Sequence, residues 1–373
     1  MKRLKEIKNH LANQFFTVLL LSLIVSSCKQ EGSKAAVAQE PEIKKKEKID
    51  IALRAVEVDS ISIRALEYDG VYWFAASKGR YGIIDAQNAT VSFMDSIQEP
   101  KNLEFRSIAV GEETVFILNA GGPAYLFEAN ENDYVQLYTE QGEGVFYDSM
   151  KFWENGEGII FGDPTAQDDV KCLSILKTTD FGKTWNKVSC DKLPEFIDGE
   201  AGFAASNSNI SIVGDQVWIA TGGAAARVLH SLDRGATWEV QETPIVAGAQ
   251  MTGIFAMDFY DENVGVIVGG DWSDKEKNTQ NLAMTRDGGA SWELISEGSG
   301  PGYCSDILFI PNTDGKELLA VGTPGIWWSG DQGVTWKQIS EEGFYTAAME
   351  SKNKGVLTGY AKAAVFEISE SKN

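Results

Sequence analysis

The chain has 373 residues, enough for two or three average domains or for one large all-β domain. It carries 54 acidic and 33 basic residues, and the net charge of −21 excludes a surface that attracts phosphate backbones, so nucleic acid is not an expected partner. Only two histidines are present, which excludes metal sites built from several histidines.

The first 28 residues have the pattern of a signal peptide. Basic residues precede the apolar run FFTVLLLSLIV, which ends in small residues before Cys28. The motif VSSC at 25–28 resembles the bacterial lipobox, which implies that Cys28 is acylated and becomes the first residue of a mature lipoprotein. Because Lys29 follows the cysteine, and not the Asp associated with inner-membrane retention, the outer membrane is the expected location. The alternative is an ordinary signal peptide with an incidental cysteine.

Residues 29–48 are charged, small or proline-containing and have no apolar period. A segment with so little apolar surface to bury stays unfolded, so we predict a flexible tether here. The folded domain is predicted over residues 49–370, and it begins with a strand at 49–58 that has no partner nearby in the sequence.

Seven pairs of short apolar segments follow along the chain. The second member of each pair runs into glycine, as in VYWFAASKG from residue 71, and turn residues such as ENGEG separate the two members, which predicts β-hairpins. No segment after residue 50 keeps a helical period over three turns, so the chain is predicted to be all-β. The first members of the pairs are RALEY at 64, RSIAV at 106, SMKFW at 149, GFAAS at 202, FAMDFY at 255, DILFI at 306 and TAAME at 346.

Four of the seven units end in nearly the same turn: TTDFGKTW at 178, SLDRGATW at 231, TRDGGASW at 285 and SGDQGVTW at 329. These stretches match the Asp-box, which caps the hairpin between the third and fourth strands of a blade in sialidases and other propellers. Each turn has one carboxylate, so four calcium or catalytic sites are not expected. We expect the Asp to accept backbone N–H bonds within the turn and the Trp to pack in the core. The pairs are Asp180 and Trp185, Asp233 and Trp238, Asp287 and Trp292, and Asp331 and Trp336.

Units of this length with four short strands each predict a seven-bladed β-propeller. The last unit has room for only three strands. The strand at 49–58 is therefore expected to supply the fourth and to close the ring, which removes its free edges.

Cys172 and Cys190 lie on either side of the first Asp turn, so a hairpin there would bring them roughly opposite each other. In an oxidising envelope compartment they would form a disulfide, and the alternative is two buried thiols. Cys304 has no evident partner.

No catalytic constellation is evident. His230 directly precedes an Asp turn and is expected to be a strand residue, so neither a His-based metal site nor a Ser-His-Asp triad is supported. No phosphate-binding loop or dinucleotide motif occurs, so no cofactor is expected. A sialidase would need three clustered arginines and an Arg-Ile/Leu-Pro signature, and the nearest segment, SIRAL at 62–66, lacks the proline.

The face of the ring away from the Asp turns is the expected binding surface, and we call it the upper face. The innermost strand of a blade begins there and the second strand ends there, so charged residues at these positions ring the mouth of the central channel. A solvated rim without a ligand is the alternative. The candidate binding residues are Arg64, Arg80, Arg106, Asp148, Asp163, Glu200, Asp271 and Trp272, with Lys78 and Asp274 near them.

Phrases such as GIIFGDP at 158 and AGFAASNSNISIVGDQVWIATGG at 201, together with the Asp turns, resemble the photosystem II stability/assembly factor family over residues of about 60 to 367. The resemblance implies a seven-bladed propeller that binds other proteins during assembly, with no catalytic residue to carry over. Members outside phototrophs often bear the label oxidoreductase, but this chain has no cofactor motif to support that activity.

We therefore predict an envelope lipoprotein propeller that acts as a protein-binding or assembly module, with a protein client or a glycan as its partner. The alternative is a glycan-binding or glycan-hydrolysing protein of the sialidase superfamily, and an oxidoreductase is a weaker alternative. Clustering of Arg64, Arg106, Asp148 and Glu200 in one pocket beside a tyrosine would favour glycan chemistry, and a rim without a deep pocket would favour protein binding.

Overall fold

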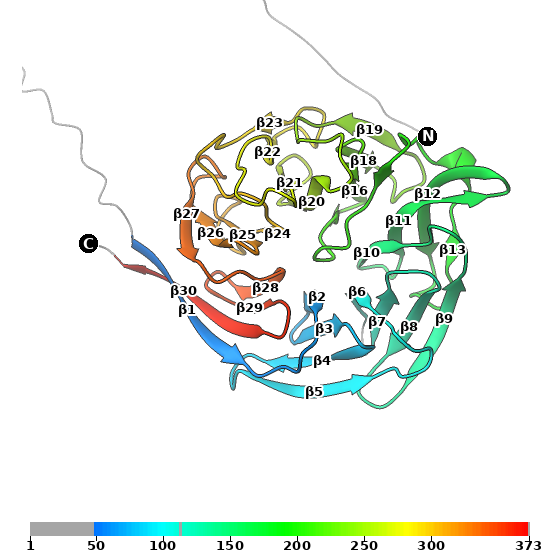
Figure 1. The fold of residues 1–373 in the computed structure, drawn as a ribbon, viewed down its shortest axis with the longest axis horizontal. Coiled ribbons are helices and arrows are strands. Elements are labelled where there is room, and N and C mark those ends of the chain that lie inside the picture. Colours follow the sequence, from blue (N-terminus) through cyan, green and yellow to red (C-terminus); the bar gives the residue numbers. More distant parts are fainter. Residues whose placement is uncertain (1–47, 112–113, 372–373) are drawn as a thin grey trace, which may run out of the picture. The chain divides into compact units, whose positions relative to one another are not determined.

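A computed structural model describes residues 48–111 and 114–371, which form a ring of seven antiparallel sheets (Figure 1). The expected signal peptide, Cys28 and the tether up to residue 47 lie outside the described residues. Within the described ranges the helical content is one three-residue 3-10 turn, η1 (Cys190–Lys192), and no helix there has the length and hydrophobicity to cross a membrane. The predicted all-β, seven-bladed propeller is confirmed.

The first three blades keep their four strands in chain order from the centre of the ring outward (Figure 1). Blade 1 contains β2 (Ile63–Tyr68), β3 (Tyr72–Ala76), β4 (Arg80–Asp85) and β5 (Thr90–Ser96). Blade 2 contains β6 (Phe105–Val110), β7 (Val115–Asn119), β8 (Ala124–Ala129) and β9 (Tyr134–Glu140). Blade 3 contains β10 (Tyr147–Phe152), β11 (Gly158–Gln167), β12 (Val170–Thr178) and β13 (Asn186–Lys187).

Blades 4 to 6 repeat this order. Blade 4 contains β15 (Ile210–Val213), β16 (Gln216–Ala220), β18 (Arg227–Ser231) and β19 (Glu239–Glu242). Blade 5 contains β20 (Thr252–Phe259), β21 (Gly265–Asp271), β22 (Leu282–Thr285) and β23 (Glu293–Leu294), and two short strands, β14 (Glu200–Ala201) and β17 (Gly222–Gly223), extend its sheet. Blade 6 contains β24 (Asp306–Phe309), β25 (Leu318–Gly322), β26 (Gly325–Ser329) and β27 (Lys337–Ser340).

Blade 7 is built from both ends of the domain. Its inner strands are β28 (Thr346–Ser351), β29 (Lys354–Thr358) and β30 (Ala363–Ser371), and its outermost strand is β1 (Lys48–Val56). β1 pairs with β30 along its whole length, from Lys48 opposite Ser371 to Val56 opposite Ala363. The N-terminal strand therefore closes the ring, as the sequence predicted.

Apolar side chains form the contacts between neighbouring blades. Trp73 and Tyr81 of blade 1 share a buried cluster with Phe105 and Phe127 of blade 2. Similar clusters join the other adjacent blades, because each sheet buries both of its faces against its neighbours.

The four Asp turns share one hydrogen-bond pattern. In the turn of blade 6, Asp331 Oδ1 accepts from Ser329 Oγ (2.9 Å) and from the Thr335 N–H (2.8 Å), and Asp331 Oδ2 accepts from Thr335 Oγ1 (2.7 Å). Asp180, Asp233 and Asp287 accept from the equivalent groups. Each carboxylate is occupied by its own turn, so these aspartates cap hairpins.

The tryptophans that end the Asp turns pack inward. Trp185 and Trp292 are buried, and Trp238 and Trp336 are partly buried against the same inter-blade clusters. The indole N–H of Trp185 donates to the Gly182 carbonyl at 2.8 Å, which ties the ring back to its own turn.

Cys172 in β12 and Cys190 in η1 are joined by a disulfide, with their Cα atoms 5.6 Å apart. β13 is only two residues long, so the link holds the chain after it against the outer part of blade 3. Cys304 is free and buried.

The prediction of a strand at GFAAS, residues 202–206, is wrong. The inner strand of blade 4 is β15, which begins only at Ile210. Ala204 and Ala205 are buried in the middle of the ring, and the polar side chains of Ser206 and Asn207 bond to several blades instead of to one partner strand.

The hydrogen bonds of the Asp turns lead to a stability prediction. In Asp331→Ala three donors lose their acceptor, so we expect the free energy of unfolding to fall by about 1 kcal/mol, the usual cost of losing a cap. Urea unfolding measures the change. The exposed Asp274 on the upper face is the control, and Asp274→Ala should stay within about 0.5 kcal/mol of the wild type. Equal effects of the two substitutions would contradict the capping role.

Candidate functional site

Residues 202–209 cross the middle of the ring and divide its central channel, and we call them the channel segment. Ala204, Ala205, Ser206 and Asn207 are buried, although none of them belongs to a strand. Residues 202–205 line a cavity on the upper face, and Ser206 and Ser208 line another that opens on the opposite face. The channel is therefore two sites and not a continuous tunnel.

Blades on all sides of the ring hold the channel segment in place. From blade 1, Arg64 donates to the Ala205 carbonyl at 3.0 Å, and from blade 2, Arg106 donates to the Ala204 carbonyl at 3.5 Å. Other bonds join Asn207 to Ile108 and Met150, Ser206 to Ser305, and Ser208 to Met257.

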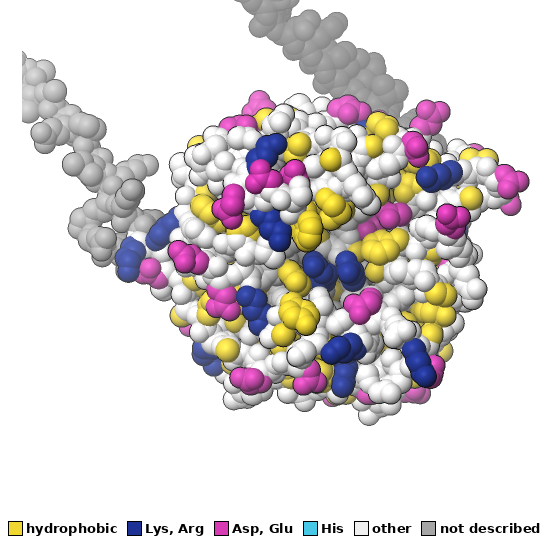
Figure 2. Space-filling view, in the orientation of Figure 1, with side chains coloured by type: hydrophobic (Ala, Val, Ile, Leu, Met, Phe, Trp, Pro, Cys, Tyr) yellow, Lys and Arg dark blue, Asp and Glu magenta, His cyan; other side chains and the backbone are white. Residues whose placement is uncertain are grey.

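The cavity on the upper face, which we call the upper cavity, has a volume of about 500 Å³. It brings together Arg64, Arg106, Asp163 and Trp272 of the predicted binding residues. On the face seen in Figure 2, basic and hydrophobic side chains gather around the centre of the ring. The upper cavity thus combines positive charge with apolar surface on a protein whose net charge is −21.

The two arginines of the upper cavity lie close enough to influence each other. Burial, together with the neighbouring charge of Arg106, lowers the pKa of Arg64. The Arg64 guanidinium also lies over the ring of Tyr345, 3.9 Å from its centroid. Among the described residues neither arginine forms an ion pair with a carboxylate, so both can receive an anionic group.

Part of the lining of the upper cavity is aromatic. Phe203 of the channel segment stacks on Phe255 with ring centroids 4.0 Å apart, and Phe255 meets Tyr303 edge to face at 4.8 Å. Trp272 and Met251 form the rim and are 45% and 38% exposed. Exposed aromatic and methionine side chains beside a cavity are typical of protein interfaces.

Two carboxyl groups belong to this region: Asp163 lines the upper cavity, and Asp148 is buried behind the lining residue Gly202. Asp163 accepts from the Gly202 N–H at 2.9 Å, and burial raises its pKa to about 6. Asp148 is fully buried, and neither of its carboxyl oxygens has a hydrogen-bond partner among the described residues. Burial and the nearby Asp163 raise the pKa of Asp148 well above its usual value.

The other predicted residues lie elsewhere. Glu200 is buried and bonds to Arg227 through both carboxylate oxygens, at 3.1 and 2.5 Å, so it takes no part in the upper cavity. Asp271 accepts from Ser273 within its own loop, and Arg80 begins β4 outside the cavity. The geometry therefore unites only part of the predicted set.

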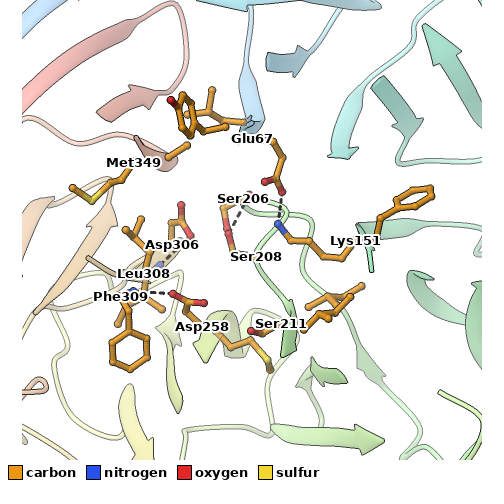
Figure 3. Close-up of a pocket in the computed structure, with 18 of the residues that line it drawn as sticks. Glu67, Lys151, Ser206, Ser208, Ser211, Asp258, Asp306, Leu308, Phe309 and Met349 are labelled. Carbon is orange, nitrogen blue, oxygen red and sulfur yellow. Dashed lines mark hydrogen bonds and ion pairs between the residues drawn. The ribbon is translucent and has the colours of Figure 1, made fainter. Parts of the chain in front are cut away.

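The larger cavity opens on the face of the Asp turns, and we call it the lower cavity (Figure 3). It has a volume of about 770 Å³ and is lined by the first strands of six blades, β2, β10, β15, β20, β24 and β28. No sequence motif predicted it. The available signal was a charged residue in each of four otherwise apolar inner strands: Glu67, Lys151, Asp258 and Asp306.

The charged groups of the lower cavity are only partly neutralised. Lys151 forms an ion pair with Glu67. Burial raises the pKa of Asp258 to about 7, with a contribution from Asp306, and burial raises the pKa of Asp306 to about 6. In residues 48–111 and 114–371, no group of three or more His, Cys, Asp or Glu side chains is arranged to hold a metal ion.

The sequence matches no protein-family model and no curated protein. The fold is similar to that of YCF48 bound to D1 peptide, with a TM-score of 0.60 and 14% identity over 84% of this chain and 95% of that chain. It is also similar to the WD40 repeats of RRP9 (TM-score 0.58, 11% identity, 86% and 98% coverage) and to YCF48 from Cyanidioschyzon merolae (0.55, 12%, 85% and 98%). At these identities the similarity shows the propeller fold alone.

The buried Asp148 leads to a prediction about pH. Its pKa in the folded chain lies above the unfolded value, so the folded state binds an extra proton, and its contribution to stability is lost as the pH rises from about 4 toward the folded pKa. Asp148→Asn removes this loss. We expect the unfolding free energy of the variant, relative to the wild type, to be larger at pH 8 than at pH 5.

Urea unfolding at pH 5, 6.5 and 8 measures this difference. Asp198→Asn is the control, because that side chain is 97% exposed and its substitution should have the same effect at each pH. A constant difference between Asp148→Asn and the wild type across the range would contradict a raised pKa of Asp148 in the folded protein.

Proposed function

We propose that this protein is a propeller module that binds another protein through a segment seated in the upper cavity. The observation that carries the proposal is the combination in one cavity of Arg64 and Arg106 with the exposed Trp272 and Met251. A peptide with an anionic group and apolar side chains fits this chemistry. The arginines would receive the anionic group, and the aromatic wall would cover the apolar side chains.

The electrostatics favour such a partner. Burial and the neighbouring charge of Arg106 disfavour the charged form of Arg64, and a bound anion would offset the repulsion between the two guanidinium groups. The rest of the protein is acidic and would repel an anionic peptide. Such a peptide is therefore expected to bind at the upper cavity in preference to other parts of the surface.

Two similarities support the same function. One of the solved structures with this fold, YCF48, is bound to a D1 peptide. Phrases of the sequence resemble the photosystem II stability/assembly factor family, whose propellers bind other proteins during assembly. We propose a role of the same kind for this chain, with a client in the cell envelope in place of a photosystem.

A substitution at the rim of the upper cavity tests the proposal. Trp272 on the upper face is 45% exposed, and Tyr260, in the turn after β20 on the opposite face, is 46% exposed. Tyr260→Ala is therefore a matched control for Trp272→Ala, because each substitution removes a similarly exposed aromatic ring from one face. We expect quantitative affinity purification from the native envelope to recover at least tenfold less partner with Trp272→Ala and an unchanged amount with Tyr260→Ala.

Two results would overturn the protein-binding function. One is the absence of any protein enriched above an untagged control. The other is an equal loss with both substitutions, which would place the contact away from the upper cavity.

Glycan binding is the second candidate function. Arg64, Arg106 and Tyr303 line the upper cavity and Asp148 lies just beneath it, which meets part of the expectation for glycan chemistry, but Glu200 is engaged with Arg227. Saturable binding of an acidic oligosaccharide by the purified protein, abolished by Trp272→Ala while no protein partner is recovered, would favour this function over the first.

We further propose that the propeller is anchored to the outer membrane through acylated Cys28. The motif VSSC at the end of the apolar segment and Lys29 after it support this location. Two acyl chains or more hold a soluble domain firmly at a bilayer, so Cys28→Ala should move the protein from the membrane fraction to the soluble fraction. Fractionation followed by immunoblotting measures the shift, and an unchanged membrane fraction would contradict the anchor.

A further inference from the structure

The lower cavity is separate from the proposed protein-binding site. It reaches from the face of the Asp turns to Ser206 and Ser208 of the channel segment, which close its inner end. Its volume of about 770 Å³ lies in the range of small-molecule sites in proteins. The lower cavity is therefore large enough for an amino-acid side chain or a small organic molecule.

The lower cavity already stabilises one ammonium group. Lys151 lies in its wall and pairs with Glu67, which also accepts from the Asn207 amide at 3.1 Å. Burial opposes the charge of Lys151, yet Glu67, with smaller contributions from Asp258 and Asp306, raises its pKa above the usual value. The electric field inside the cavity thus favours a cation.

Two further carboxyl groups lie across the lower cavity from Lys151. Asp258 Oδ2 accepts from the Phe309 N–H at 2.8 Å. Asp306, only 2% exposed, accepts from Thr346 Oγ1 and from the Ala347 N–H, both at 2.8 Å. In the part of the chain that the structure describes, neither carboxylate forms an ion pair with a basic side chain.

Among the described residues that line the lower cavity, Lys151 pairs with Glu67 and Arg234 pairs with Asp215. The exposed Glu154 and the two aspartates, Asp258 and Asp306, have no counter-ion among these residues, so the cavity keeps uncompensated negative charge. Holding carboxylates in a buried position without a counter-ion costs free energy, which a bound cation would recover. Figure 3 shows Asp258 and Asp306 on one side of the cavity and the Lys151–Glu67 pair on the other. The open space lies between the neutralised pair and the two aspartates that have no counter-ion.

Part of the remaining lining is apolar. Leu66, Met257, Leu308 and Met349 contribute aliphatic side chains to the walls. A ligand for the lower cavity therefore needs a cationic end for the aspartates and an aliphatic chain for these walls.

We propose that the lower cavity is a binding site for an alkyl ammonium ligand, with Asp258 and Asp306 receiving the ammonium group. The ligand is either a free diamine or the lysine side chain of a peptide that enters from the face of the Asp turns. Both have the same chemistry, so the experiment distinguishes them by the probe.

Calorimetric titration of the folded domain tests the site with three probes. Cadaverine represents a free diamine, Nα-acetyl-lysine methylamide represents a lysine side chain in a peptide, and 1,5-pentanediol is the neutral analogue of cadaverine. We expect saturable one-to-one binding of at least one amine and at least tenfold weaker binding of the diol. Tighter binding of cadaverine would identify a free diamine as the ligand, and tighter binding of the lysine derivative would identify a peptide.

Substitutions then locate the site. Asp258→Asn should weaken amine binding at least tenfold. Asp314 lies in the turn after β24, on the same face but outside the lower cavity, and its side chain is 87% exposed. Asp314→Asn is the control, because it removes the same charge from the protein without changing the cavity. It should change the affinity for the amine less than twofold. Circular dichroism verifies that both variants are folded.

The proposal is overturned by either of two results. One is equal binding of the diol and the amines to the wild type, a comparison that does not depend on any variant. The other is an equal loss of amine affinity in folded Asp258→Asn and Asp314→Asn, which would reduce the effect to the net charge of the protein.

Discussion

Closure of the ring by the pairing of β1 with β30 is the constraint on which the rest of the structure depends. Each blade packs only against its neighbours, so an open ring would expose the apolar faces of two blades and a free strand edge. β1 joins the two ends of the domain along all nine of its residues and buries Ile49 in the core of blade 7. The central channel, and both cavities within it, exist only because the ring is closed.

The channel segment turns this symmetrical ring into a molecule with two different faces. It bonds to Arg64 and Arg106 above and contributes Ser206 and Ser208 to the cavity below. The upper cavity is lined by arginines and aromatic rings and the lower cavity by carboxylates, so the two sites suit ligands of opposite charge. A single stretch of eight residues therefore separates two binding chemistries that a continuous channel would mix.

The repeat of turns and strands was sufficient to predict the blades, the strand that closes them and the Asp turns, because these features depend on local patterns. The prediction of a strand at 202–206 was wrong, because an apolar segment buried in a channel has the same composition as a buried strand. The Glu200–Arg227 pair and the lower cavity could not be predicted, because they join residues from strands far apart in the sequence. Charged residues within short apolar strands, such as Asp258 in β20, are the one local sign that such a cavity exists.

Hydrogen–deuterium exchange of the protein with its co-purified partner shows whether the partner binds on the upper face. We expect the partner to slow exchange in the loops that carry Met251 and Trp272 and in residues 202–205, and to leave the Asp turns around Asp180 and Asp331 unchanged. Protection confined to the Asp turns, with no change around Trp272, would contradict binding on the upper face.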